Sequence, residues 1–139
     1  MSSFVDTGAF YALADSGDKH HQRAKTYYAA NIKSGLFLTS EYVFVESWTL
    51  IHHKLGKAAS QKFWETIRTN VFPLQRVTAL DLERAWEISN KYGDQDFSLV
   101  DCTSFAIMER PNLVEVFSFD HHFTVFRPKS GIPFRLHPA

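Results

Sequence analysis

Short apolar segments with strand character alternate along this chain with longer segments of helical periodicity. Because Pro73 has no amide hydrogen for a central ladder, the strand that contains it is expected at a sheet edge. Strands separated by helices usually lie parallel in one sheet whose two faces the helices cover. The expected strands are residues 4–5, 36–38, 72–77, 114–119 and 132–136, and the expected helices are residues 8–14, 18–31, 44–55, 58–69, 78–93 and 98–110.

Helical periodicity is clearest in the third of these helices. Phe44, Trp48, Ile51 and Leu55 recur at spacings of four, three and four residues, and Gly56 is placed to end the helix. Elsewhere the boundaries depend on single residues, since Asp18 is expected to cap the second helix, Thr78 to start the fifth and Ser98 to cap the sixth.

Size and charge restrict the class of protein. The 139 residues are expected to form one domain, 1–139, without a linker or a repeat. Fifteen basic and fifteen acidic side chains balance, which gives no sign of a strongly basic nucleic-acid binder. If several acids gather around one cation, however, the remaining surface is more basic than this total. No apolar run approaches the roughly 20 residues of a membrane span, and there is no signal peptide, so we expect no membrane association and a cytoplasmic location.

Four carboxylates stand out against apolar sequence. Asp6 follows the first expected strand and Asp120 ends the strand at 114–119. The carboxyl edge of a parallel sheet is where ligands bind, and acids gathered there repel one another unless a cation joins them. Glu46 lies on an apolar helix face, and a buried unpaired carboxylate is costly. Asp101 opens the last expected helix. Hard carboxylate oxygens suit Mg²⁺ or Mn²⁺, so these acids predict a metal site.

Each acid also has a structural interpretation. Asp101 ends a Ser98-x-x-Asp sequence that is typical of a helix start, and capping alone could explain it. Asp6 could cap the following helix, and Asp96 is interpreted as a turn residue or an outer ligand. Hydroxyls beside the acids, at Thr7 and Ser118, could hydrogen-bond a ligand phosphate or a metal-bound water, but the favoured interpretation is that of ordinary turn and strand groups.

Histidine and cysteine offer little alternative chemistry. The sequence contains no HExxH or CxxC motif, and adjacent histidines on a helix do not make the i, i+4 zinc clamp. The single cysteine, Cys102, has apolar neighbours that indicate a buried and inert thiol. The paired histidines are His20 and His21, His52 and His53, and His121 and His122. The last pair follows Asp120 and could contact substrate, but surface or loop packing is the favoured interpretation.

Four segments in order resemble the PIN domain family, in particular its VapC-type toxin branch. They are FVDT at 4–7, ESWTLI at 46–51 ahead of KLG at 54–56, SLVDCTSFA at 98–106 and FSFDHHF at 117–123. The resemblance implies a three-layer α/β/α sandwich with a central, mainly parallel sheet, and metal-dependent cleavage of RNA. It also implies a small antitoxin protein as a partner and a homodimer. Pro111-Asn112 stands where the family commonly has glycine.

By this resemblance Asp6, Glu46, Asp101 and Asp120 occupy the family's acidic positions. Asp6 and Asp101 are then expected as principal ligands of Mg²⁺ or Mn²⁺, with Asp120 assisting, while Glu46 orients or deprotonates the attacking water. Two other interpretations stay open. One is an acid-pocket phosphatase in which Asp6 attacks phosphate, although that pattern usually has a second aspartate where this chain has Gly8. The other is a non-catalytic binding module.

Overall fold

Five parallel strands form the central sheet of the computed structural model, which describes residues 2–139. The strands follow the order β3-β2-β1-β4-β5, and every neighbouring pair is parallel. The expected parallel sheet is confirmed, and so is the edge position of the strand next to Pro73. The strands are β1 (Ser2–Val5), β2 (Leu36–Ser40), β3 (Leu74–Gln75), β4 (Glu115–Phe117) and β5 (Arg135–His137).

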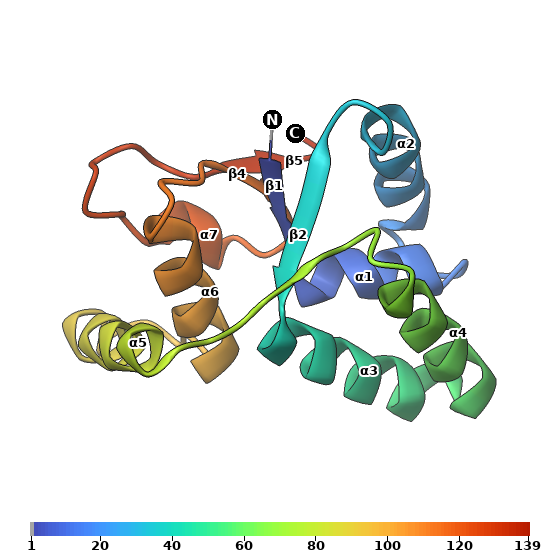
Figure 1. The fold of residues 1–139 in the computed structure, drawn as a ribbon, viewed down its shortest axis with the longest axis horizontal. Coiled ribbons are helices and arrows are strands. Elements are labelled where there is room, and N and C mark those ends of the chain that lie inside the picture. The colour runs from blue at the N-terminus through green and yellow to red at the C-terminus, as the bar shows by residue number, and fades with distance from the viewer. Residues whose placement is uncertain (1) are drawn as a thin grey trace.

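Helices cover both faces of this sheet and complete a three-layer α/β/α sandwich (Figure 1). Helices α1, α2 and α4 lie to one side of the strands and α5, α6 and α7 to the other (Figure 1). Helix α3 contacts α1, α4 and α6, so it connects the two helical layers. The helices are α1 (Thr7–Ala14), α2 (His21–Asn31), α3 (Glu41–Leu55), α4 (Lys57–Arg68), α5 (Ala79–Lys91), α6 (Leu99–Glu109) and α7 (His122–Val125).

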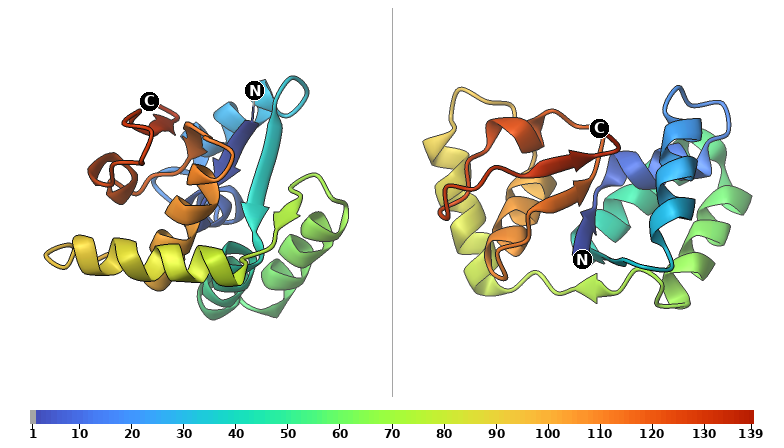
Figure 2. Two further views of the ribbon diagram at one scale, coloured as in Figure 1. Left: turned by 60° about the vertical axis from the view of Figure 1, so that its left-hand side comes forward. Right: turned by 90° about the horizontal axis from the view of Figure 1, so that it is seen from above.

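The chain changes direction in the sheet at β1. From β1 it builds β2 and β3 on one side, and it returns later to add β4 and β5 on the other (Figure 2). The two central strands are in register, with Val5 beside Phe117, and the Asp6 amide donates a hydrogen bond to the Phe117 carbonyl at 3.1 Å. Open α/β sheets bind ligands at the carboxyl ends of the strands where such a reversal occurs. In this chain that point lies between Asp6 and the residues after β4.

Phenylalanine rings fill the space between the sheet and the helices. Phe4 and Phe117 are fully buried in the two central strands. On the α6 side, the Phe105 and Phe126 rings stack with centroids 4.6 Å apart. Burial of such rings contributes about 1.5–3 kcal/mol each, so this core holds the strand ends that carry the site in fixed positions.

Three details differ from the sequence expectations. Helix α2 starts at His21, because the carboxylate of Asp18 accepts a hydrogen bond from the His20 amide at 2.9 Å in a preceding turn. In α5, Trp86 is 66% exposed, and the buried face is formed instead by Ala85 and Ile88. The short helix α7 was not expected. Within residues 2–139, the structure contains no helix that is both long and apolar enough to cross a membrane.

Candidate active site

The four predicted carboxylates line one cavity of about 560 Å³ at the carboxyl edge of the sheet. They come from four separate elements. Asp6 precedes α1, Glu46 lies within α3, Asp101 lies in the first turn of α6, and Asp120 follows β4. The structure therefore brings together side chains that are up to 114 positions apart in the sequence, and Asp96 lines the same cavity.

Asp6 is the most deeply buried of these acids, with 5% of its surface exposed. The Ser118 hydroxyl donates a hydrogen bond to its Oδ2 at 3.1 Å. The pKa of Asp6 is raised to about 7, and burial is the largest cause. The Thr7 backbone and the Ser118 hydroxyl lower this pKa by hydrogen bonding, while the negative charges of Asp101 and Asp120 raise it. A cation beside this carboxyl group would favour its ionised form.

Asp101 has two sets of contacts. Its backbone amide and carboxylate form a capping box with Ser98, at 3.0 Å in each direction, so the structural interpretation of this acid is confirmed. The same Oδ2 lies 3.0 Å from His122 Nδ1. An ionised carboxylate can only accept, so Nδ1 is the donor in this contact. Asp101 thus both starts helix α6 and faces the cavity.

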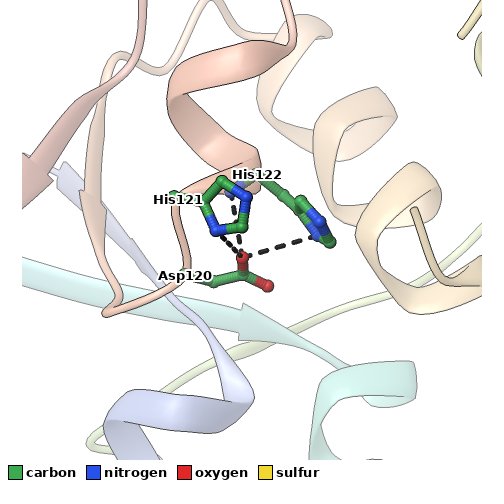
Figure 3. A group of neighbouring side chains, drawn as sticks. All are labelled: Asp120, His121 and His122. Carbon is green, nitrogen blue, oxygen red and sulfur yellow. Dashed lines mark hydrogen bonds and ion pairs between the residues drawn. The ribbon is translucent and has the colours of Figure 1, made fainter. Parts of the chain in front are cut away.

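Asp120 lies in a group with the two histidines that follow it (Figure 3). Its Oδ1 accepts a hydrogen bond from the His122 amide at 2.9 Å and lies 3.4 Å from His122 Nδ1 and 3.8 Å from His121 Nδ1. One ligand atom from each of the three residues lies within 4.8 Å of the others. The Ser118 hydroxyl accepts from the Asp120 amide at 3.0 Å, so Ser118 connects Asp120 to Asp6.

Glu46 is held by a residue of the neighbouring helix. The Thr7 hydroxyl donates to Glu46 Oε1 at 2.6 Å, across 39 positions of sequence. Thr7 is buried and Glu46 is half-buried, so this contact fixes the direction of the carboxylate toward the cavity.

The donor atoms of this cavity fit a divalent cation. Carboxylates from four elements line the cavity, and among residues 2–139 no lysine or arginine lines it to balance their charge. Among the described residues, the group of three ligand atoms that lie within 4.8 Å of one another is that of Asp120, His121 and His122. Oxygen donors of this kind are the ligands that Mg²⁺ and Mn²⁺ prefer.

Sequence patterns did not favour a role in the site for three polar residues that contact the acids. Surface or loop packing was the favoured interpretation of His122, but this residue contacts two of the acids. Thr7 and Ser118 bind Glu46 and Asp6 and are more than ordinary turn and strand hydroxyls. For Thr7 and Ser118 the only available signal was their position beside the acids, because their contacts depend on the order of strands.

The chain is similar to known proteins in both sequence and fold. Residues 3–127 match the PIN domain. The chain is 34% identical over 121 residues to the 23S rRNA-specific endonuclease VapC20 of Mycobacterium tuberculosis, an alignment that covers 87% of this chain and 91% of that protein. The crystal structure of VapC20, described as a sarcin–ricin loop cleaving toxin, superposes with a TM-score of 0.83 at 31% identity and covers 90% of this chain and 94% of that one.

More distant structures share the fold. VapBC2 from Rickettsia felis, bound to a DNA fragment from its promoter, has a TM-score of 0.70 at 13% identity and covers 99% of this chain and 98% of that one. FitAcB from Neisseria gonorrhoeae has a TM-score of 0.63 at 12% identity, with 87% and 88% covered. With a family match over most of its length and a homologous rRNA endonuclease, the chain belongs to the PIN domain family.

Proposed function

We propose that this protein is a metal-dependent endoribonuclease and the toxin of a toxin–antitoxin pair. The observation that carries the proposal is the convergence of Asp6, Glu46, Asp101 and Asp120 on one cavity, with Asp6 buried and without a balancing cationic side chain among the described residues that line it. The homology to VapC20 supports cleavage of RNA by this cavity.

In this proposal Asp6 and Asp101 hold Mg²⁺ or Mn²⁺, and Asp120 assists. The bound cation would offset the charge that develops on the phosphoryl oxygens during hydrolysis. Ser118 orients Asp6, and His122 orients Asp101. These contacts hold the carboxylates in place before substrate arrives.

Glu46 has a separate role as the general base. Thr7 occupies its Oε1, so we assign Oε2 to accept the proton of the attacking water.

Ribosomal RNA is the proposed substrate class. VapC20 is named as specific for 23S rRNA and for cleavage of the sarcin–ricin loop, and this chain aligns with most of that protein. Such a substrate would place the protein in the cytoplasm. We also propose that a small antitoxin protein binds this chain and that the chain forms a homodimer, as the resemblance implies.

The test is an RNA cleavage assay on intact ribosomes and total RNA, with Mg²⁺, with Mn²⁺ and with EDTA. The wild-type protein is expected to produce discrete cuts in 23S rRNA that EDTA abolishes. Asp6→Asn removes a proposed ligand and should reduce the cleavage rate at least about 100-fold, since the proposed cation supplies much of the stabilisation of the transition state.

Asp94→Asn is the matched control, because Asp94 is an exposed aspartate that does not line the cavity. It should cleave at the wild-type rate. Equal cleavage by Asp6→Asn and wild-type protein would refute the assigned site. Cleavage by neither, with both proteins folded by circular dichroism, would instead favour the non-catalytic binding module.

A further inference from the structure

Besides the imidazoles of His121 and His122, two further aromatic rings line the acidic cavity. The imidazole of His20 stacks on the ring of Phe119, with centroids 4.3 Å apart and planes only 7° from parallel. Both side chains are half-buried, and Phe119 directly precedes Asp120. The proposed reaction at the carboxylates uses neither ring, so this stack is a part of the cavity without an assigned role.

We propose that the His20–Phe119 pair is a stacking platform that binds a nucleobase next to the phosphate that is cleaved. This inference rests on the proposed endoribonuclease function and adds how the substrate is held. An aromatic face beside a nuclease site binds a base without reading its identity, because every base has a π-face. Phe119 supports one face of the imidazole, and the other face is the surface offered to the base.

The platform is held in position before substrate arrives. The Asp18 carboxylate accepts a hydrogen bond from the His20 amide at 2.9 Å. The next residue, His21, donates from Nδ1 to the Ala12 carbonyl at 2.7 Å, which ties this turn to helix α1. A ring whose backbone is fixed in this way loses little conformational freedom when a base stacks on it.

Positive charge lies close to the platform although the cavity itself is acidic. The guanidinium carbon of Arg23 lies 5.6 Å from the centroid of Phe119, and this side chain is exposed. Its Nη2 donates to the carbonyls of Pro138 and Ala139 at 3.2 and 3.3 Å. Arg23 therefore places a cation at the outer side of the aromatic pair, where it favours the approach of an anionic RNA strand.

The size of the cavity is compatible with this arrangement. Its volume of about 560 Å³ falls within the usual range of about 300–1,000 Å³ for small-ligand sites. The carboxylates and the aromatic pair that line this space match the two parts of a nucleotide, a phosphate that needs a cation and a base that needs a flat apolar surface.

His20→Ala should raise KM about tenfold and change kcat by less than about twofold, because stacking stabilises the bound substrate and the transition state alike. His20→Phe keeps a ring on Phe119 and should restore KM to within about threefold of wild type. The substrate is a short RNA oligonucleotide that spans the mapped cut, or the sarcin–ricin loop if no cut is found. His53→Ala, an exposed histidine of α3 outside the cavity, is the matched control and should leave both constants unchanged.

A binding measurement provides the second readout. In the Asp6→Asn background, an abasic site beside the cut position should weaken RNA binding about tenfold, and the same abasic site should have no effect once His20 is alanine. Thermal unfolding of each variant shows whether it is folded.

The outcomes separate the two proposals. Suppose that wild-type protein cleaves RNA. A wild-type KM for His20→Ala would then refute the platform, and so would an abasic effect that persists without His20. In both cases the nuclease function stands. If wild-type protein cleaves no RNA, the function fails, and the binding experiment still decides whether His20 contacts a base.

Discussion

The carboxyl group of Asp6 shows how the site depends on single contacts. Its burial at the end of β1 raises its pKa, and hydrogen bonds from the Thr7 backbone and the Ser118 hydroxyl act against that change. Thr7 acts in two ways, since its backbone amide hydrogen-bonds to Asp6 and its hydroxyl donates a hydrogen bond to Glu46. One residue thus positions two members of the proposed catalytic group.

This double role leads to a prediction at Thr7. Thr7→Val keeps the shape and the backbone amide but removes the donor to Glu46 Oε1, so the proposed base loses its orientation. We expect kcat to fall about tenfold with little change in KM. Steady-state kinetics with the RNA oligonucleotide measure both constants.

Thr7→Ser is the control, since it restores the hydroxyl. Recovery of at least half of kcat in Thr7→Ser would support a positioning role for the hydroxyl. Equal kcat values for wild type and Thr7→Val would contradict it.

At the scale of elements, the joint between α3 and α4 fixes the direction of the helix that carries Glu46. Gly56 connects these helices with φ of 93° and ψ of −176°, a backbone conformation that is almost restricted to glycine. A Cβ added there would meet nothing within 4 Å, so a substitution would encounter backbone strain alone.

Gly56→Ala is therefore expected to lower the free energy of unfolding by about 1–3 kcal/mol. Urea denaturation at constant pH measures this difference. Gly93→Ala is the matched control, because Gly93 lacks a positive φ and its added Cβ would make only an ordinary contact at 3.4 Å with the Asn90 carbonyl. Loss of the same stability in both variants would show that the strain at Gly56 is not the cause.

At the scale of the whole molecule, the acidic cavity sets how stability depends on pH. The folded protein holds the Asp6 proton up to about pH 7, whereas an unfolded aspartate loses it near 3.8. The protonated group therefore stabilises the fold fully below about pH 4, and this contribution is lost as the pH rises toward 7.

Glu115 acts in the opposite sense. Burial raises its pKa, but Arg135 and His137 lower it more, so its contribution is lost at acidic pH.

Without metal, we expect the free energy of unfolding to fall between pH 4 and pH 7, by on the order of 4 kcal/mol for Asp6 alone. Asp6→Asn should remove this part of the decline. Mg²⁺ favours the ionised carboxylates, so it should raise the unfolding temperature more at pH 8 than at pH 5. Urea titrations in EDTA and thermal scans with Mg²⁺ measure the two effects. Parallel pH curves for wild type and Asp6→Asn would rule out Asp6 as their origin.

Local sequence patterns predicted most of the elements and singled out the acids. Helical and strand periodicity depend on hydrogen bonds and side-chain directions within a few residues, so segments such as the helix that carries Phe44 and Trp48 were predictable. The alternation of these segments also predicted the parallel sheet. The expected sheet edge predicted that Asp6 and Asp120 lie in one cavity, and the resemblance to the PIN domain added Glu46 and Asp101.

The fold in three dimensions selects the side chains that contact the acids and the rings that line the cavity. The contacts Thr7 to Glu46, Ser118 to Asp6 and His20 to Phe119 join residues 39, 112 and 99 positions apart. The first contact forms because α1 packs on α3, the second because β1 and β4 are neighbours, and the third because α2 contacts the end of β4. Local sequence patterns contain no record of that arrangement. Tertiary packing also explains which face of α5 is buried, because that face packs against α6.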